Sequence, residues 1–275
     1  YFYIKKDANS KIDSIHYKFD KSTHTGTETL MMIASVLPGT KTILENAAEE
    51  PEIDELINLL NQMGAKIVRT QRRVIEIEGV SRLRGTNFTI GPDRNEVVTF
   101  AIAAIVTQGD VFIKDADKVD LTAFIQRLEV VGGGVEKKKD GIRFYYKGKI
   151  RNADVETSSA PGFMTDWQGP WAVLMTKAQG VSVIHETVYE NRFSYVEQLE
   201  KMGAKIELFN PPVSNPQNFY NFNWSDNKPE YQHGAKIYGS TRLHNAVVTI
   251  GDLRAGATLV LAALAARGKS IIYGV

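Results

Sequence analysis

Residues 27–44, TETLMMIASVLPGTKTIL, combine a dense apolar run, a glycine and a short β-branched segment. The apolar run is long enough for a helix, and the β-branched residues after the glycine favour a strand. The same phrase recurs three more times along the chain, and its glycines are Gly39, Gly109, Gly180 and Gly268. A recurrence of this kind, with a period of about 70 residues, indicates a repeat fold.

Each copy is expected to contain two helices, each followed by a strand. The first helix is apolar nearly all round and should be buried on every side, whereas the second has a charged face. Each second helix ends at a glycine that suits a left-handed C′ residue: Gly64, Gly132 and Gly203. We expect first helices at 27–37, 96–106, 167–178 and 253–266, and second helices at 52–63, 121–131 and 195–202. The pattern predicts an α/β fold whose core is formed by helices wrapped in sheets.

The composition is that of a globular protein with one large domain or two ordinary ones, since 43% of the 275 residues are hydrophobic and 24% are charged. The 33 lysines and arginines nearly balance the 32 acidic residues, which argues against nucleic acid or a membrane surface as a partner.

The sequence contains no cysteine, which excludes a disulfide framework and a cysteine-based zinc site within it. The longest apolar stretch, 259–266, is far shorter than the roughly 20 residues of a membrane span. With no signal peptide at its start, the chain is expected to be cytoplasmic.

One segment between the first and second copies marks a domain boundary. Residues 85–94, GTNFTIGPDR, carry Gly91 and Pro92 in succession, which favours a break in regular structure. We therefore expect one domain in residues 1–91 and another in 92–275.

The longer last interval of the repeat comes from an insertion at about 210–233, NPPVSNPQNFYNFNWSDNKPEYQH. Its turn-forming residues and the aromatic residues Phe219, Tyr220, Phe222 and Trp224 are typical of an ordered loop, and packing against the parent domain is favoured over a role in substrate binding. Both ends of the chain look cut, because Tyr1 stands where a methionine would begin a gene product and 270–275 stop just after a strand-like run. A longer protein is expected.

A repeat fold should bring the starts of the four first helices to one surface, and these starts are polar. They read KSTHTGT at 21–27, PDRN at 92–95, PGFMTDWQ at 161–168 and GDLRA at 251–255. Helix N-termini carry unpaired N–H groups and about half a positive charge, so a set of them forms an anion site without net basic charge. The small residues near Thr23 would let backbone amides approach phosphate oxygens, and Lys21 would add charge.

Each of these residues also has a plainer interpretation, as part of an ordinary helix start. The threonines of 21–27 and the aspartates Asp93, Asp166 and Asp252 are also ordinary N-cap residues, with neighbouring arginines as ion-pair partners. No second histidine lies at metal-ligand spacing from His24, so no metal site is expected. Spacing alone therefore indicates a site without naming its substrate.

Five stretches resemble the signature sequences of the UDP-N-acetylglucosamine 1-carboxyvinyltransferase family. They are ILENAAEEPEIDELINLLNQMGAK at 43–66, PDR at 92–94, PGFMTDWQ at 161–168, ETVYENRF at 186–193 and DLRAGA at 252–257. The resemblance runs along essentially the whole chain apart from the insertion. It implies the inside-out α/β prism of the enolpyruvyl transferases, in which two domains of three βαβαββ units bury their helices inside sheets and close over a cleft. By this resemblance, residues 1–91 end the first domain and 92–275 form most of the second.

The resemblance also implies a reaction. Members of this family transfer the enolpyruvyl group of phosphoenolpyruvate to the 3-hydroxyl of UDP-N-acetylglucosamine and release phosphate, in the first committed step of peptidoglycan synthesis. No cofactor and no metal are implied. Two alternatives stay open: an enolpyruvyl transferase with another acceptor, such as shikimate 3-phosphate, and a non-catalytic relative that kept the fold.

The resemblance assigns a catalytic role to one carboxylate. Asp166 matches the family's aspartate that contacts the sugar hydroxyl and is the usual candidate for the general base. The family's general acid, a cysteine or aspartate, and the residues that grip phosphoenolpyruvate lie outside the matched stretches. A polypeptide of these residues alone is therefore expected to show no turnover, and phosphate release from it with both substrates would contradict that expectation.

Seven further residues are matched to substrate binding. Lys21, Ser22, Thr23 and His24 match the stretch that contacts the UDP moiety, and His24 and Thr25 depart from the family's common Ser-Val-Gly-Ala. Val188 matches a position whose backbone contacts the sugar. Arg192 and Arg254 resemble arginines of the cleft.

Overall fold

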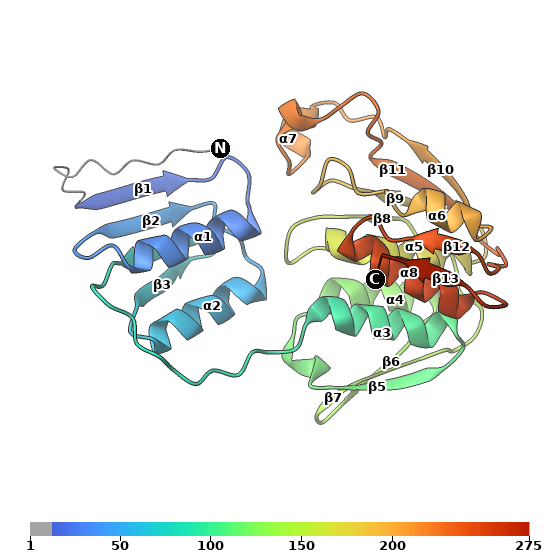
Figure 1. Ribbon diagram of the computed structural model, residues 1–275, viewed down its shortest axis with the longest axis horizontal. Coiled ribbons are helices and arrows are strands. Elements are labelled where there is room, and N and C mark those ends of the chain that lie inside the picture. Colours follow the sequence, from blue (N-terminus) through green and yellow to red (C-terminus); the bar gives the residue numbers. More distant parts are fainter. Residues whose placement is uncertain (1–12, 275) are drawn as a thin grey trace. The chain divides into compact units, whose positions relative to one another are not determined.

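The computed structural model describes residues 13–274, and the chain divides into two compact units, residues 1–90 and 91–275 (Figure 1). Within residues 13–274, no helix combines the length and hydropathy that crossing a membrane requires.

The first unit is one four-stranded sheet with two helices. Its elements are β1 (Ser14–Lys18), α1 (His24–Ser35), β2 (Lys41–Glu45), α2 (Pro51–Gln62), β3 (Lys66–Gln71) and β4 (Val74–Glu78). The strand order is β1-β2-β4-β3, with β1 parallel to β2 and β4 antiparallel to both of its neighbours. Burial alternates along β2 and β4, so one face of this sheet packs against the helices and carries Leu44, Ile75 and Ile77.

Helix α1 does not meet the expectation of burial on every side. Met31 and Ala34 are buried, whereas Met32, Ile33 and Val36 are 45%, 51% and 47% exposed. The reason is that α1 packs against β4 and α2, and no further helix of residues 13–90 covers its outer face. An apolar surface therefore lies on the outside of the first unit.

The second unit builds the same phrase three times. The first copy is α3 (Arg94–Val106), β5 (Asp110–Lys114), α4 (Thr122–Val131), β6 (Gly134–Lys138) and β7 (Gly141–Tyr145). The second is β8 (Val155–Glu156), α5 (Gln168–Thr176), β9 (Val181–His185), α6 (Val196–Lys201), β10 (Lys205–Phe209), α7 (Pro216–Phe219) and β11 (Gly234–Tyr238). The third is β12 (Val247–Thr249), α8 (Leu253–Ala265) and β13 (Ile271–Tyr273). Single-turn 3₁₀ helices occupy Ala116–Lys118, Thr165–Trp167 and Trp224–Asp226.

Three helices form the centre of the second unit and sheets surround them. Helices α3, α5 and α8 pack on one another in pairs, and the sheets have the orders β5-β7-β6, β10-β11-β9-β8 and β12-β13. All nine residues of α5 are buried, including Trp171, which confirms the predicted arrangement of helices inside sheets. Helix α8 is less enclosed, since its Val260 and Leu264 are 42% and 58% exposed. Within residues 13–274, the sheet of its own copy, β12-β13, has only two strands.

The glycines after the second helices adopt the predicted left-handed conformation, with φ of 102° at Gly64, 96° at Gly132 and 89° at Gly203. A different constraint acts on Gly239, which follows β11 and donates its N–H to the carbonyl oxygen of Gly180 at 2.9 Å. A Cβ on Gly239 would lie 2.0 Å from the carbonyl oxygen of Ala178, just after α5. The close approach of two backbones therefore requires glycine there.

We expect Gly239→Ala to lower the free energy of unfolding of the second unit by about 2 kcal/mol, because the added methyl forces the backbone away from Ala178. All three tryptophans lie in this unit, so urea unfolding followed by tryptophan fluorescence measures the effect. Gly251→Ala is the matched control, since a Cβ there meets no atom within 4 Å. Equal midpoints for the two variants would contradict the prediction.

The insertion packs against the sheet that carries β9 and β11, as its aromatic content predicts. Tyr220 and Phe222 are 2% and 7% exposed, and the Tyr220 ring stacks on Trp224 with ring centres 5.2 Å apart. The Tyr220 hydroxyl lies 3.2 Å from Nε2 of His185 on β9. His233, at the end of the insertion, is 2% exposed and hydrogen-bonds Asn227.

These two histidines predict a pH dependence of stability. Burial lowers the pKa of His233, with a further contribution from His185, and burial lowers the pKa of His185 against the opposing effect of Glu156. The unfolded chain therefore binds these protons at a higher pH than the folded chain. Their contribution to stability is fully present above about pH 6.5 and is lost as the pH falls through the lower folded pKa values.

We expect the urea midpoint of the second unit to fall between about pH 7.5 and pH 5.5, and to fall less in His233→Gln. Glutamine retains an amide that can reach Asn227 but takes up no proton in this range. Identical pH slopes for the two proteins would contradict the prediction.

Candidate functional site

The residues predicted for the site fall in both units. Lys21, Ser22, Thr23 and His24 lie at the start of α1 in the first unit, and Asp166, Val188, Arg192 and Arg254 lie in the second. The structure brings three of the latter into direct contact: Asp166, Arg192 and Arg254.

Asp166 lies on the 3₁₀ turn Thr165–Trp167 that leads into α5. Its position is fixed by Trp167, which is 2% exposed and packs edge to face against Phe163 with ring centres 5.6 Å apart. The N-cap interpretation of Asp166 is wrong, because α5 begins without a side-chain cap and the carboxylate points to two arginines instead. Asp93 and Asp252, in contrast, do cap α3 and α8.

Both guanidinium groups donate to the same carboxylate oxygen. Arg192 Nη2 and Arg254 Nε donate to Oδ1 of Asp166, the latter at 2.5 Å. From residues 13–274, Oδ2 of Asp166 accepts no hydrogen bond, and the side chain is 21% exposed. One oxygen is therefore held in place and the other is available to an incoming hydroxyl.

The two arginines reach Asp166 from different elements. Arg254 is the second residue of α8, whose start is fixed by Asp252 accepting from the backbone N–H groups of Arg254 and Ala255. Arg192 follows β9 and lies over the ring of Tyr189 at 4.7 Å, and its Nε has no hydrogen-bond partner within the described part of the chain. Burial lowers the pKa of Arg192, and Asp166 opposes this shift. A buried cation with a free donor is suited to bind an oxygen of a ligand.

Glu186 joins the two loops on which Asp166 and Val188 lie. Its Oε1 accepts from the backbone N–H groups of Val188 at 2.8 Å and Tyr189 at 3.0 Å. Its Oε2 accepts from Thr165 Oγ1 at 2.8 Å and Gln168 Nε2 at 3.1 Å. Glu186 is 1% exposed, and this burial raises its pKa while the hydrogen bonds oppose the shift.

Sequence reasoning missed Glu186 and Gln168 as parts of the site. Gln168 is itself held, because the buried Tyr195 hydroxyl donates to its Oε1 at 2.6 Å. The sequence signal that could have identified Glu186 is its position directly after the expected strand VSVIH, as the first residue of ETVYENRF. A carboxylate at the end of a buried strand requires donors around it.

In the first unit, the start of α1 has the geometry of an ordinary capped helix. Thr23 Oγ1 accepts from the backbone N–H of Gly26 at 3.2 Å, which supports the N-cap interpretation of Thr23. His24 Nε2 lies 3.4 Å from Glu28 one turn along the helix. Lys21 and Ser22 are half-buried in the segment that precedes the helix.

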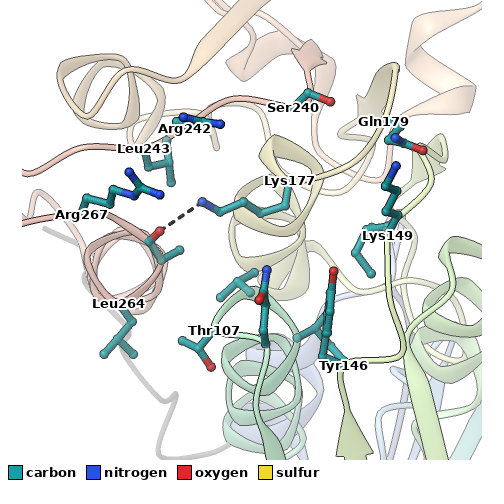
Figure 2. A pocket seen from close by; sticks show the side chains of 15 residues that line it. Thr107, Tyr146, Lys149, Lys177, Gln179, Ser240, Arg242, Leu243, Leu264 and Arg267 are labelled. Carbon is teal, nitrogen blue, oxygen red and sulfur yellow. Dashed lines mark hydrogen bonds between the residues drawn. The ribbon is translucent and has the colours of Figure 1, made fainter.

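A larger cavity of about 530 Å³ lies at the other end of the three central helices, where α3, α5 and α8 finish. Figure 2 shows its cationic side chains, with Lys177 directed at the carbonyl oxygen of Ala265, which accepts at 3.1 Å. The other cations are Lys149, Arg242 and Arg267. Cations at helix C-termini stabilise the exposed carbonyl groups, which explains their presence here.

The pocket beside Asp166 is much smaller, about 10 Å³, but carboxylate, guanidinium and buried hydrogen-bonding groups converge on it. Within residues 13–274, no group of three or more histidine, aspartate or glutamate side chains is arranged to hold a metal ion. We therefore take the Asp166 pocket as the candidate site.

Three comparisons define the class of this protein. The sequence model of the EPSP synthase (3-phosphoshikimate 1-carboxyvinyltransferase) family matches residues 2–275. The chain belongs to this family, and the resemblance inferred from its five stretches is confirmed at that level. Two solved structures share the fold: the enolpyruvyl transferase NikO of Streptomyces tendae (TM-score 0.76, 22% identity, 95% of this chain and 60% of that one) and EPSP synthase of Acinetobacter baumannii (0.63, 17%, 95% and 58%).

Within the family, the chain resembles curated proteins of one name. It is 42% identical over 273 residues to the UDP-N-acetylglucosamine 1-carboxyvinyltransferase of Desulfatibacillum aliphaticivorans, which covers 99% of this chain and 60% of the relative. The protein of the same name from Bartonella henselae is 38% identical over 273 residues, with 98% and 58% covered. The chain therefore spans about 60% of the length of these curated relatives.

Proposed function

We propose that the protein containing this chain transfers the enolpyruvyl group of phosphoenolpyruvate to the 3-hydroxyl of UDP-N-acetylglucosamine and releases phosphate. The observation that carries the proposal is the carboxylate of Asp166, held through one oxygen by Arg192 and Arg254 while the other oxygen stays available. In this proposal residues 1–91 end one enolpyruvyl transferase domain and 92–275 form most of the second. In this proposal the reaction supplies a precursor for peptidoglycan and takes place in the cytoplasm.

The proposed reaction is an addition followed by an elimination. Oδ2 of Asp166 accepts the proton of the sugar 3-hydroxyl as the oxygen attacks C2 of phosphoenolpyruvate, and C3 is protonated by an acid outside this chain. A proton then leaves C3 and phosphate leaves C2, which restores the carbon–carbon double bond. The two arginines orient the carboxylate, so the base is pre-positioned before substrate binds.

The remaining predicted residues bind substrate in this proposal. The first backbone amides of α1, near Thr23 and His24, receive the diphosphate of UDP, with Lys21 and Ser22 beside it. The backbone of Val188 contacts the sugar and is held by Glu186. Arg192 and Arg254 line the same pocket as Asp166.

An acceptor panel tests the proposal. We expect the full-length protein to release phosphate from phosphoenolpyruvate with UDP-N-acetylglucosamine and not with shikimate 3-phosphate. Activity only with shikimate 3-phosphate would assign the protein to the other acceptor class. No release with any acceptor, from protein shown to be folded, would favour a non-catalytic relative.

A further inference from the structure

The insertion lies at the same end of its sheet as the loop that follows β9. In the register of the strands, His185 at the end of β9 pairs with Gly234 at the start of β11, and Gly234 pairs with Phe209 at the end of β10. The insertion connects β10 to β11 (Figure 1), and β11 lies between β10 and β9, so the end of the insertion adjoins the end of β9. Its last residue continues the pairing, because Glu186 N–H donates to the carbonyl oxygen of His233 at 2.8 Å.

One residue of the insertion contacts both loops of the candidate site. The backbone N–H of Asn221 donates to the carbonyl oxygen of Thr187 at 2.7 Å. Its side-chain Nδ2 donates to Ser159 Oγ at 3.0 Å. Thr187 immediately precedes Val188, and Ser159 lies in the segment that leads to Asp166.

The two loops are also joined directly. Thr187 N–H donates to Thr157 Oγ1 at 2.8 Å, and Thr187 Oγ1 donates to the Thr157 carbonyl oxygen at 2.5 Å. Asn221 adds a bond on the far side of Thr187 and one to Ser159, two residues beyond Thr157. It therefore fixes the segment nearer to Asp166, which the Thr157 bonds do not reach.

Asn221 is itself held rigidly, since its neighbours Tyr220 and Phe222 are both buried. The Tyr220 ring packs against both Trp224 and His233, with ring centres 5.2 Å and 4.9 Å away. A short polar side chain between two buried aromatic anchors has little freedom, so its hydrogen bonds cost little entropy to form.

We propose that Asn221 is a positioning residue of the transferase site. It holds segments 157–163 and 186–188 together, so that Asp166 and the backbone of Val188 contact the same sugar. This inference rests on the proposed function. Asn221 acts through Ser159 and Thr187 and does not itself touch substrate.

Two measurements test this role in the full-length protein carrying Asn221→Ala. The first is amide hydrogen exchange without substrate, where the peptide covering 158–164 is expected to lose protection, because alanine removes the Nδ2 bond to Ser159 and keeps the backbone bond to Thr187. The second is steady-state phosphate release, where kcat/KM for UDP-N-acetylglucosamine is expected to fall about fivefold, mainly through KM, while the KM for phosphoenolpyruvate stays unchanged. Asn218→Ala, an exposed site in the same insertion, is the matched control.

The partner variant Ser159→Ala completes a double-mutant cycle. If Asn221 acts through Ser159, the double variant loses no more than Asn221→Ala alone, whereas additive losses would overturn this link. Unchanged exchange, or lost protection with unchanged KM in an active protein, would overturn the positioning role. If the unmodified protein shows no transfer to UDP-N-acetylglucosamine, the proposed function fails, and exchange still decides whether Asn221 holds the two loops.

Discussion

Asp166→Asn in the full-length protein is expected to lower the rate of phosphate release by about 10²-fold or more, as removal of a general base does. Asparagine has the same shape, and its amide oxygen can still accept from Arg192 and Arg254 at the position of Oδ1. It lacks the second basic oxygen, so the proton of the acceptor hydroxyl has no carboxylate to move to. The measurement is kcat with both substrates saturating.

Asp140→Asn is the control for Asp166→Asn, because it removes the same charge from an exposed turn of the same unit. Its rate should match that of the unmodified protein. An Asp166→Asn protein that is folded and as active as the control would show that another group takes the proton.

Glu186→Ala is expected to lower the free energy of unfolding of the second unit by about 3 kcal/mol. The substitution leaves four donors without their acceptor in a buried region: the N–H groups of Val188 and Tyr189, Thr165 Oγ1 and Gln168 Nε2. The catalytic rate should fall as well, because the same bonds hold the turn of Asp166. Urea unfolding followed by tryptophan fluorescence measures the stability.

Two variants control for Glu186→Ala. Glu190→Ala removes a half-buried carboxylate from the same loop and should change stability little. Glu186→Gln keeps one acceptor oxygen but presents an amide to two donors, so it should fall between alanine and the unmodified protein. Equal stability of Glu186→Ala and Glu190→Ala would show that the four bonds contribute nothing net.

The fold was predictable because periodicity and glycine placement are local signals. The run 167–178 is apolar on every side, and α5 is buried on every side. The same signal was misleading for α1, because full burial also needs neighbours that the sequence of the helix does not specify. The exposure of Met32 and Ile33 follows from what packs around α1, not from its own residues.

The candidate site was only partly predictable, because its bonds join residues far apart in the chain. The local sequence around Asp166 fits both an N-cap and a general base. The contact that argues against the N-cap is with Arg254, 88 positions away, which no local pattern relates to Asp166. Glu186 and Asn221 were missed for the same reason, since their partners lie on other loops.

Both arginines bind a single oxygen of Asp166, and this affects the selectivity for the configuration of the sugar at C3. Under the proposed function the proton can leave the sugar in one direction only, toward Oδ2. A nucleotide sugar of inverted configuration at C3 would point its hydroxyl away from that oxygen, so it could bind and still remain unreacted. Lysine in place of Arg254 would keep the charge but replace the rigid guanidinium, whose Nε holds Oδ1, with a flexible ammonium group, and discrimination between the two epimers would weaken.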